Sequence, residues 1–189
     1  HIDCSSADLA AARSLHQFLE QNLGRDGGQK LAAIPLHNMF GVTSTAGASF
    51  LVRADTIVDA AFAADPGYAN MVQNLWADFV SFVGSSKTAG VFDKDSYVCE
   101  LYMLLLAKLI AVNVIDKSAR ISLRHELDEV LNGQYFRNKG LTNFVEYDYF
   151  GWLTKPLHST PLSLLASDIQ QALKAFDFSY IVPEDLFGP

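Results

Sequence analysis

The sequence predicts an all-α protein, an irregular helical bundle around a central buried helix at about residues 96–116. Apolar residues recur at helical spacing in several segments, and capping residues, glycines or prolines separate these segments. No segment alternates strongly enough to predict a sheet. The chain has 189 residues and is 50% hydrophobic, which allows one sizeable core or two small lobes that share an interface.

In the N-terminal half, we expect a first helix from Ser6, a suitable N-cap, to Leu23. The segment Lys30 to Leu36 could form a short helix that Pro35 ends. Residues 37–49 are rich in glycine, serine and threonine and predict a loop. Their glycine spacing fits neither the Walker pattern nor the dinucleotide fingerprint, so a phosphate-binding role is not favoured.

Two further helices follow in this half. The first runs from Phe50 to Ala64, and Asp65-Pro66-Gly67 breaks it. Pro66 fits the first turn of the next helix, which extends from about Tyr68 to Val83. Residues 84–92 are the best candidate for a linker. They divide the chain into an N-terminal helical lobe, 1–84, and a second lobe, 93–189, although the two could equally form one domain.

The longest predicted helix runs from Ser96 to about Asp116, with Asp93 or Asp95 as its cap. Apolar residues appear on all of its sides, which is typical of a helix in the middle of a bundle. Glu100, Lys108 and Asn113 interrupt its apolar run, so a buried helix is favoured over a membrane span.

After this helix, a short amphipathic helix is expected from Leu123 to Leu131, with Ser122 as its cap and Asn132-Gly133 at its end. Residues 134–153 are dense in aromatic side chains without a clean period. A last helix begins near Ser159 or Thr160, with Pro161 in its first turn. Pro183 predicts the start of one more helix.

The first residue is His1, and no signal-peptide pattern follows it, so we expect a piece of a larger protein. Cys4 and Cys99 do not form a disulfide framework, and a cytoplasmic location is the expectation. Cys99 lies in an apolar helical run and is expected to be an inert core residue.

The net charge of −7 is unevenly distributed. Residues 1–84 and 146–189 each carry a net charge of −4, whereas residues 85–145 carry +1. Binding to phosphates needs clustered lysine and arginine. Only the middle third of the chain could therefore face nucleic acid.

The sequence holds no complete catalytic or metal-binding motif. The five histidines show no ligand spacing, and no serine lies in a nucleophile motif. Glu146 and Asp148 would share one face of an extended segment and could do acid–base work, although hydrogen bonding to nearby groups is the favoured interpretation. Asp65-Pro66-Gly67-Tyr68 is similar to the motif of amino-methyltransferases, but its third residue is glycine and it predicts a turn between helices.

Residues 92–153 contain a sequence pattern that is similar, over about 60 residues, to a pattern in known proteins. FDKDSYVCELYMLLLAKLIAVN is followed by VLNGQYFRNKGLTNFVEYDYFGWL. The order, spacing and aromatic residues resemble the helical region that precedes the catalytic domain in N6-adenine DNA methyltransferases of restriction-modification systems. Type I modification subunits and fused type II restriction-modification enzymes are the two kinds that it resembles. The final PEDLFGP is similar to the lead into the next helix of those proteins.

This resemblance implies a non-catalytic helical domain that helps to clamp DNA or to contact other subunits and domains. S-adenosylmethionine is implied for the parent protein, and no cofactor is expected in this fragment. The implied partners are the downstream methylase domain, DNA and a specificity or restriction subunit, without a membrane. The catalytic motif and the cofactor loop lie downstream in that family, so no catalytic, cofactor-binding or metal residue can be assigned.

If this fragment holds DNA, the candidate contacts are its central basic residues, Lys117, Arg120, Arg124, Arg137 and Lys139. Several acidic residues lie among them, so a solvated face of mixed charge is the favoured alternative. Two other functions stay open. The chain could be a helical protein–protein interaction module unrelated to DNA modification, or a small enzyme that uses Glu146 and Asp148.

Overall fold

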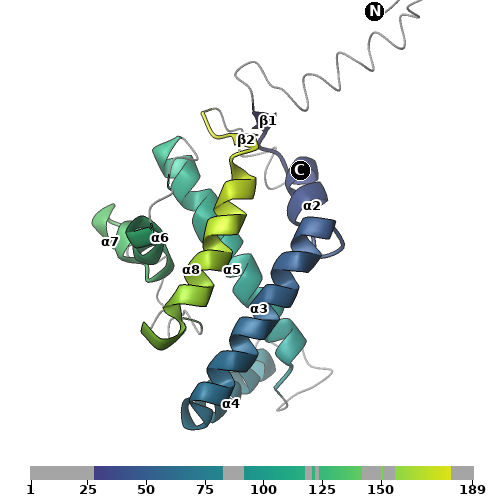
Figure 1. The fold of residues 1–189 in the computed structure, drawn as a ribbon, viewed down its shortest axis with the longest axis vertical. Helices are drawn as coiled ribbons and strands as arrows, with labels where there is room; N and C mark the ends of the chain where they lie inside the picture. The colour runs from purple at the N-terminus through teal and green to yellow at the C-terminus, as the bar shows by residue number, and fades with distance from the viewer. Residues whose placement is uncertain are drawn as a thin grey trace, which may run out of the picture.

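The computed structural model describes residues 28–82, 92–117, 121, 124–141, 150 and 156–179. These residues form seven helices and one two-stranded sheet, which confirms the predicted all-α class (Figure 1). The elements in chain order are β1 Gln29–Lys30, α2 Ala33–Phe40, α3 Thr45–Ala64, α4 Pro66–Phe82, α5 Lys94–Asp116, α6 Arg124–Leu131, α7 Gln134–Asn138, α8 Pro156–Leu173 and β2 Phe176–Asp177.

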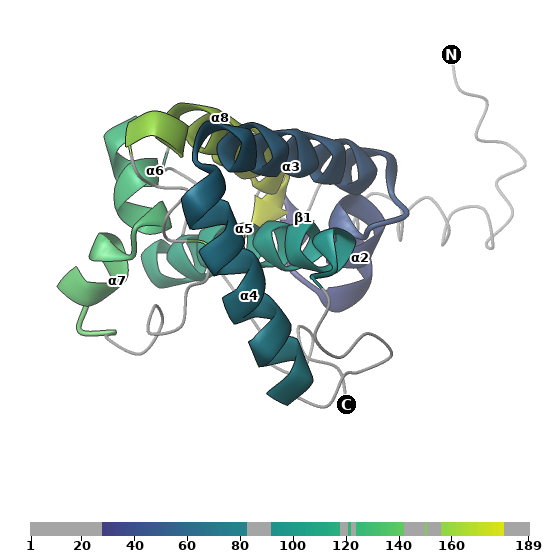
Figure 2. The same cartoon turned by 90° about the horizontal axis from the view of Figure 1, so that it is seen from below.

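Helices α3, α5 and α8 pack against one another and form the centre of the bundle (Figure 1). Helices α6 and α7 lie together on one side of it, and α4 starts at the end of α3 (Figure 2). The buried apolar side chains of α3, α5, α6 and α8 belong to one core cluster. Both predicted lobes contribute to that cluster, and the division at residues 84–92 stays a prediction.

Helix α5 is the centre of this core, as its sequence predicts. Tyr97, Leu109 and Val112 are fully buried on it, and the helix begins within two residues of the predicted start. By length and composition α5 could cross a membrane, but half of its most apolar window is buried inside the protein.

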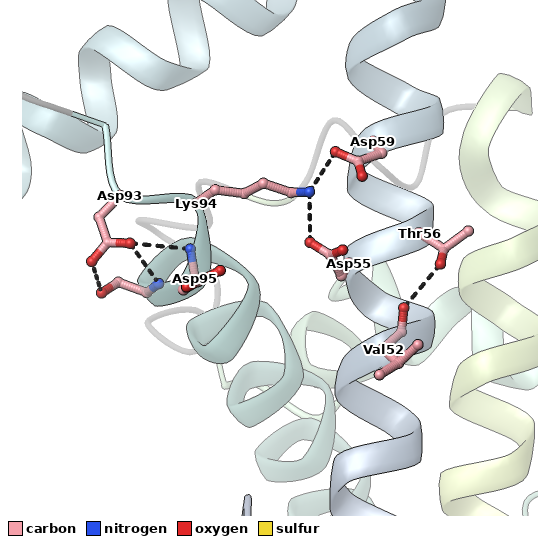
Figure 3. Close-up of polar contacts among 8 residues, drawn as sticks. Val52, Asp55, Thr56, Asp59, Asp93, Lys94 and Asp95 are labelled. Atoms are coloured by element: carbon pink, nitrogen blue, oxygen red, sulfur yellow. Dashed lines mark hydrogen bonds and ion pairs between the residues drawn. The ribbon is translucent and has the colours of Figure 1, made fainter.

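The predicted N-cap of α5 is confirmed at Asp93. Its carboxylate accepts hydrogen bonds from the backbone N–H groups of Asp95 and Ser96, at 3.1 and 3.3 Å, and from the Ser96 hydroxyl at 2.6 Å (Figure 3). The next residue, Lys94, bridges Asp55 and Asp59 of α3 at 2.7 and 2.5 Å. The first turn of α5 is therefore attached to the middle of α3.

Two polar pairs connect the remaining long helices. Asn113 of α5 and Gln170 of α8 exchange two hydrogen bonds, of 2.9 and 2.8 Å. Both residues are buried, with exposed fractions of 0% for Asn113 and 2% for Gln170. On the surface, Arg53 of α3 contacts Asp168 of α8 at 2.6 Å. Both contacts fix the position of α8 along its neighbours.

The predictions for residues 30–49 were wrong. Lys30 pairs in a parallel sheet with Asp177, and Pro35 lies in the first turn of α2 instead of ending a helix. The predicted loop 37–49 contains the end of α2 and the start of α3.

A tight connection makes those two helices possible. The Ser44 hydroxyl accepts a hydrogen bond from the Gly47 N–H at 2.9 Å and donates one to the Met39 carbonyl at 2.7 Å. A Cβ atom at Gly47 would lie 2.2 Å from the Gly41 carbonyl oxygen, so only glycine fits there. The glycine and serine content of this segment reflects a helix cap and a close backbone approach.

The start of the last helix was also predicted wrongly. Helix α8 begins at Pro156, so neither Ser159 nor Thr160 caps it, and Pro161 lies inside the helix. As the sixth residue of α8, Pro161 lacks the N–H that would bond the carbonyl four residues earlier, so one hydrogen bond of the helix is missing there. The structure also shows that α7 lies in the aromatic stretch 134–153, where no helix was expected.

The turn predicted between α3 and α4 is confirmed. Asp65 ends α3, and its carboxylate accepts a hydrogen bond from the Tyr68 N–H at 3.0 Å in the first turn of α4. Pro66 is the first residue of α4, as expected. The expected helix 6–23, the Ser122 cap, residues 84–91 of the expected linker 84–92 and the helix after Pro183 lie outside the described residues.

Replacing Asn113 by leucine should destabilise the protein, because the buried amide of Gln170 loses both partners. An unpaired buried amide costs about 1–3 kcal/mol. Adding Gln170→Met should recover most of this loss, because neither polar group then remains. Urea unfolding of the single and double variants measures the coupling. If the double variant lost the sum of the free energies lost in the two single variants, the two side chains would not act as a pair.

Replacing Asp93 by alanine should lower the free energy of unfolding by about 1 kcal/mol at neutral pH, which is typical for loss of an N-cap. The hydrogen bonds from Ser96 lower the pKa of the Asp93 carboxyl. This cap stabilises the fold above the unfolded-state pKa of aspartate and is lost as pH falls through the lowered value. Thermal unfolding at several pH values should therefore show the variant's deficit shrinking in acid. Asp93→Asn is the control, since it keeps a capping side chain, and a deficit independent of pH would exclude this account.

Candidate functional site

The structure describes four of the five basic residues proposed to contact DNA, all near α6 and α7. Lys117 is the C-cap of α5 in a left-handed conformation, with φ of 52°. Arg124 begins α6, Arg137 lies in α7 and Lys139 directly follows α7. Arg120 lies outside the described residues. Lys117 thus lies at the end of α5, and the other three lie on or directly after α6 and α7, which pack against each other beside α8 (Figure 1).

Lys139 is engaged with other side chains of the protein. Its ammonium group lies 5.6 Å from the centre of the Tyr135 ring and 3.8 Å from an Asp116 carboxylate oxygen. The Tyr135 hydroxyl donates a hydrogen bond of 2.8 Å to the same carboxylate. Burial, followed by this hydrogen bond, raises the pKa of Tyr135, so the phenol stays protonated and connects α7 to the end of α5.

The two arginines also have partners. Arg137 donates to the Asn132 carbonyl and to the Gln134 side chain, both at 3.2 Å. Arg124 donates to the Thr160 hydroxyl of α8. All three contacts are exposed to solvent, so they orient the guanidinium groups without preventing an additional contact to a phosphate.

The charges on this surface are balanced. Among the described residues from 116 to 141, the four basic side chains are matched by four acidic ones, Asp116, Glu126, Asp128 and Glu129. Asp128 accepts a hydrogen bond from the Ser163 hydroxyl of α8. A surface with no net positive charge attracts phosphates weakly. A DNA contact here would have to use single arginines and lysines instead of a basic patch, and it stays a prediction.

The motif residues that the structure describes have structural roles. Lys108 is 2% exposed, and its ammonium group donates to the Leu131 carbonyl at the end of α6 at 2.8 Å. Gly133 has a φ of 78°, a conformation that favours glycine, and Phe136 of α7 is completely buried. These described residues of the pattern in 92–153 therefore fix how α5, α6 and α7 fit together.

The other chemistry-bearing residues do not assemble into a reactive site in the part of the chain that is described. No group of three histidine, cysteine or acidic side chains there could hold a metal ion. Cys99 is partly buried, and burial followed by the charge of Glu100 raises the pKa of its thiol, which disfavours the reactive thiolate. Glu146 and Asp148 lie outside the described residues.

Sequence reasoning missed one surface, the outer face of α4. Val72 and Trp76 are buried, and the Trp76 ring lies 5.3 Å from the Tyr97 ring of α5. Met71 and Leu75, on the adjacent face, are 45% and 49% exposed, and Phe82 at the end of the helix is 91% exposed. The signal was the width of the apolar arc, which exceeds what one neighbouring helix can cover.

Comparison with known proteins gave no match: no protein-family model, no curated protein and no solved structure matches this chain. The resemblance to the helical region of N6-adenine DNA methyltransferases therefore stays a prediction from the sequence pattern in residues 92–153.

Proposed function

We propose that this chain is a non-catalytic helical domain of a DNA N6-adenine methyltransferase or restriction-modification enzyme in the cytoplasm. Its role is to contact the downstream methylase domain, DNA or a specificity or restriction subunit. The downstream domain binds S-adenosylmethionine and carries out methyl transfer. The observation that carries this proposal is the sequence pattern of residues 92–153.

The contacts of the pattern's polar residues support a scaffolding role. Lys108 binds the end of α6, and Asn113 binds α8. Tyr135 connects α7 to the end of α5 through Asp116. Each of these side chains positions a helix. A catalytic side chain would instead have to be available to a substrate.

The second candidate function is a helical protein–protein interaction module unrelated to DNA modification. The exposed apolar face of α4 favours it, because contiguous apolar surface on a soluble protein is typical of a contact site. Both candidates assign a contact role to the chain. They differ in whether methyltransferase motifs belong to the same protein.

The coding sequence beyond residue 189 separates these two candidates. We expect it to encode a cofactor-binding loop of the FxGxG type, followed by an NPPY or NPPF motif. A protein that continues without either motif would refute the methyltransferase proposal and leave the interaction module as the better candidate.

The DNA-contact part of the proposal predicts that Arg137→Ala combined with Lys139→Ala weakens binding of duplex DNA by the protein that contains this chain. Each lost phosphate contact should reduce the slope of log affinity against log salt by about 1. Fluorescence anisotropy across a salt series measures both quantities. Lys174→Ala is the matched control, because Lys174 is an exposed lysine beyond the end of α8. Unchanged affinity and slope in the double variant would exclude contacts at these residues.

A further inference from the structure

We propose that the outer face of α4 binds an amphipathic helix of a partner protein, one that carries a lysine or arginine at the centre of its apolar face. This inference rests on the contact role proposed above and specifies the chemistry of one partner. It is carried by the spacing of the exposed residues of α4 and by the charge among them.

The exposed residues of α4 follow the spacing of a helix–helix seam. Met71, Leu75, Asp78 and Phe82 are separated by four, three and four residues, which places them in one line along the helix. This line, called the α4 seam below, spans roughly 16 Å at the usual rise per residue. All four residues are exposed, so no other part of the chain that the structure describes covers the α4 seam.

The last turns of α4 have no neighbouring helix on their outer side among the described residues. Figure 2 shows α4 extending from the end of α3, with its last turns directed away from the other helices. The opposite side of α4 is anchored in the protein, because Ala69, Val72 and Trp76 are buried. A partner helix could lie against the α4 seam without displacing these contacts.

Asp78 determines the charge of the partner. It is the one charged side chain of α4, and it forms no hydrogen bond or ion pair with the residues that the structure describes. A carboxylate in the middle of an apolar seam loses water when a partner covers it. A facing lysine or arginine compensates that loss, whereas an apolar or acidic residue does not.

The same carboxylate argues against a second copy of this chain as the occupant. Symmetric pairing of two α4 seams would place two Asp78 carboxylates in one short apolar interface. Like charges in such an interface are unfavourable and select against that pairing. The charge of the α4 seam therefore favours a different protein with a basic group.

Two stapled three-heptad peptides test this inference. Both carry leucine at the seam positions except the central one, which is lysine in the first peptide and glutamate in the second. Fluorescence anisotropy with the full chain should show at least about tenfold tighter binding of the lysine peptide, equivalent to about 1.4 kcal/mol. Asp78→Lys should reverse this preference, because it reverses the central charge.

Two further variants separate the seam from general apolar binding. Leu75→Gln should weaken binding of both peptides about tenfold or more. Leu164→Gln should leave binding unchanged, since Leu164 is a 58% exposed leucine on α8, away from the α4 seam. Because both leucines are exposed, circular dichroism and the unfolding midpoint should match the unmodified chain.

The other outcomes are distinguishable. Equal binding of the two peptides that is lost in Leu75→Gln would refute the charge requirement and leave the contact role intact. Binding of neither peptide, or equal effects of Leu75→Gln and Leu164→Gln, would refute both the α4 seam and its contact role. A dimer in light scattering that Leu75→Gln dissociates would identify a second copy as the occupant and overturn the inference.

Discussion

The burial of α5 is the constraint on which the rest of the structure depends. A polar side chain on a buried helix needs a bonded partner, because an unpaired one costs about 1–3 kcal/mol. Lys108 meets this need at the carbonyl end of α6, and Asn113 meets it at Gln170 of α8. Apolar contacts alone would tolerate a shift of these helices along α5. The polar pairs permit one position of each helix.

This arrangement determines which surfaces are left for function. Helices α3 and α8 cover α5, and ion pairs with Lys94 and between Arg53 and Asp168 hold α3 in place. The basic residues near α6 and α7 are largely occupied by contacts within the protein, as Lys139 is by Asp116 and Tyr135. Among the described residues, α4 is covered on one side only, and its other side is the exposed seam of three apolar residues and one acid.

Much of the fold could be predicted from the sequence, because local signals decide helix type and many helix ends. The Asp93 cap and the turn at Asp65-Pro66 are of this kind. Ser44 and Gly47 were misinterpreted because a glycine-rich composition describes a loop and a tight helix connection equally well. The distant partners of the basic residues, Asp116 for Lys139 and Thr160 for Arg124, could not be predicted, since they lie on other helices. The same holds for the outer face of α4, where the neighbouring helices decide which half of an apolar arc is covered.

Native-state hydrogen exchange of the full chain tests this account most directly, because it measures the stability of each helix separately. If α5 is the centre of the core, its amides from about Leu101 to Asn113 should be the most protected. The last turns of α4 are covered on one side only among the described residues. Their amides should therefore exchange through local openings that cost much less free energy. Exchange from α5 that precedes exchange from α3 and α8, or equal protection along all of α4, would contradict the proposed centre and the exposed contact helix.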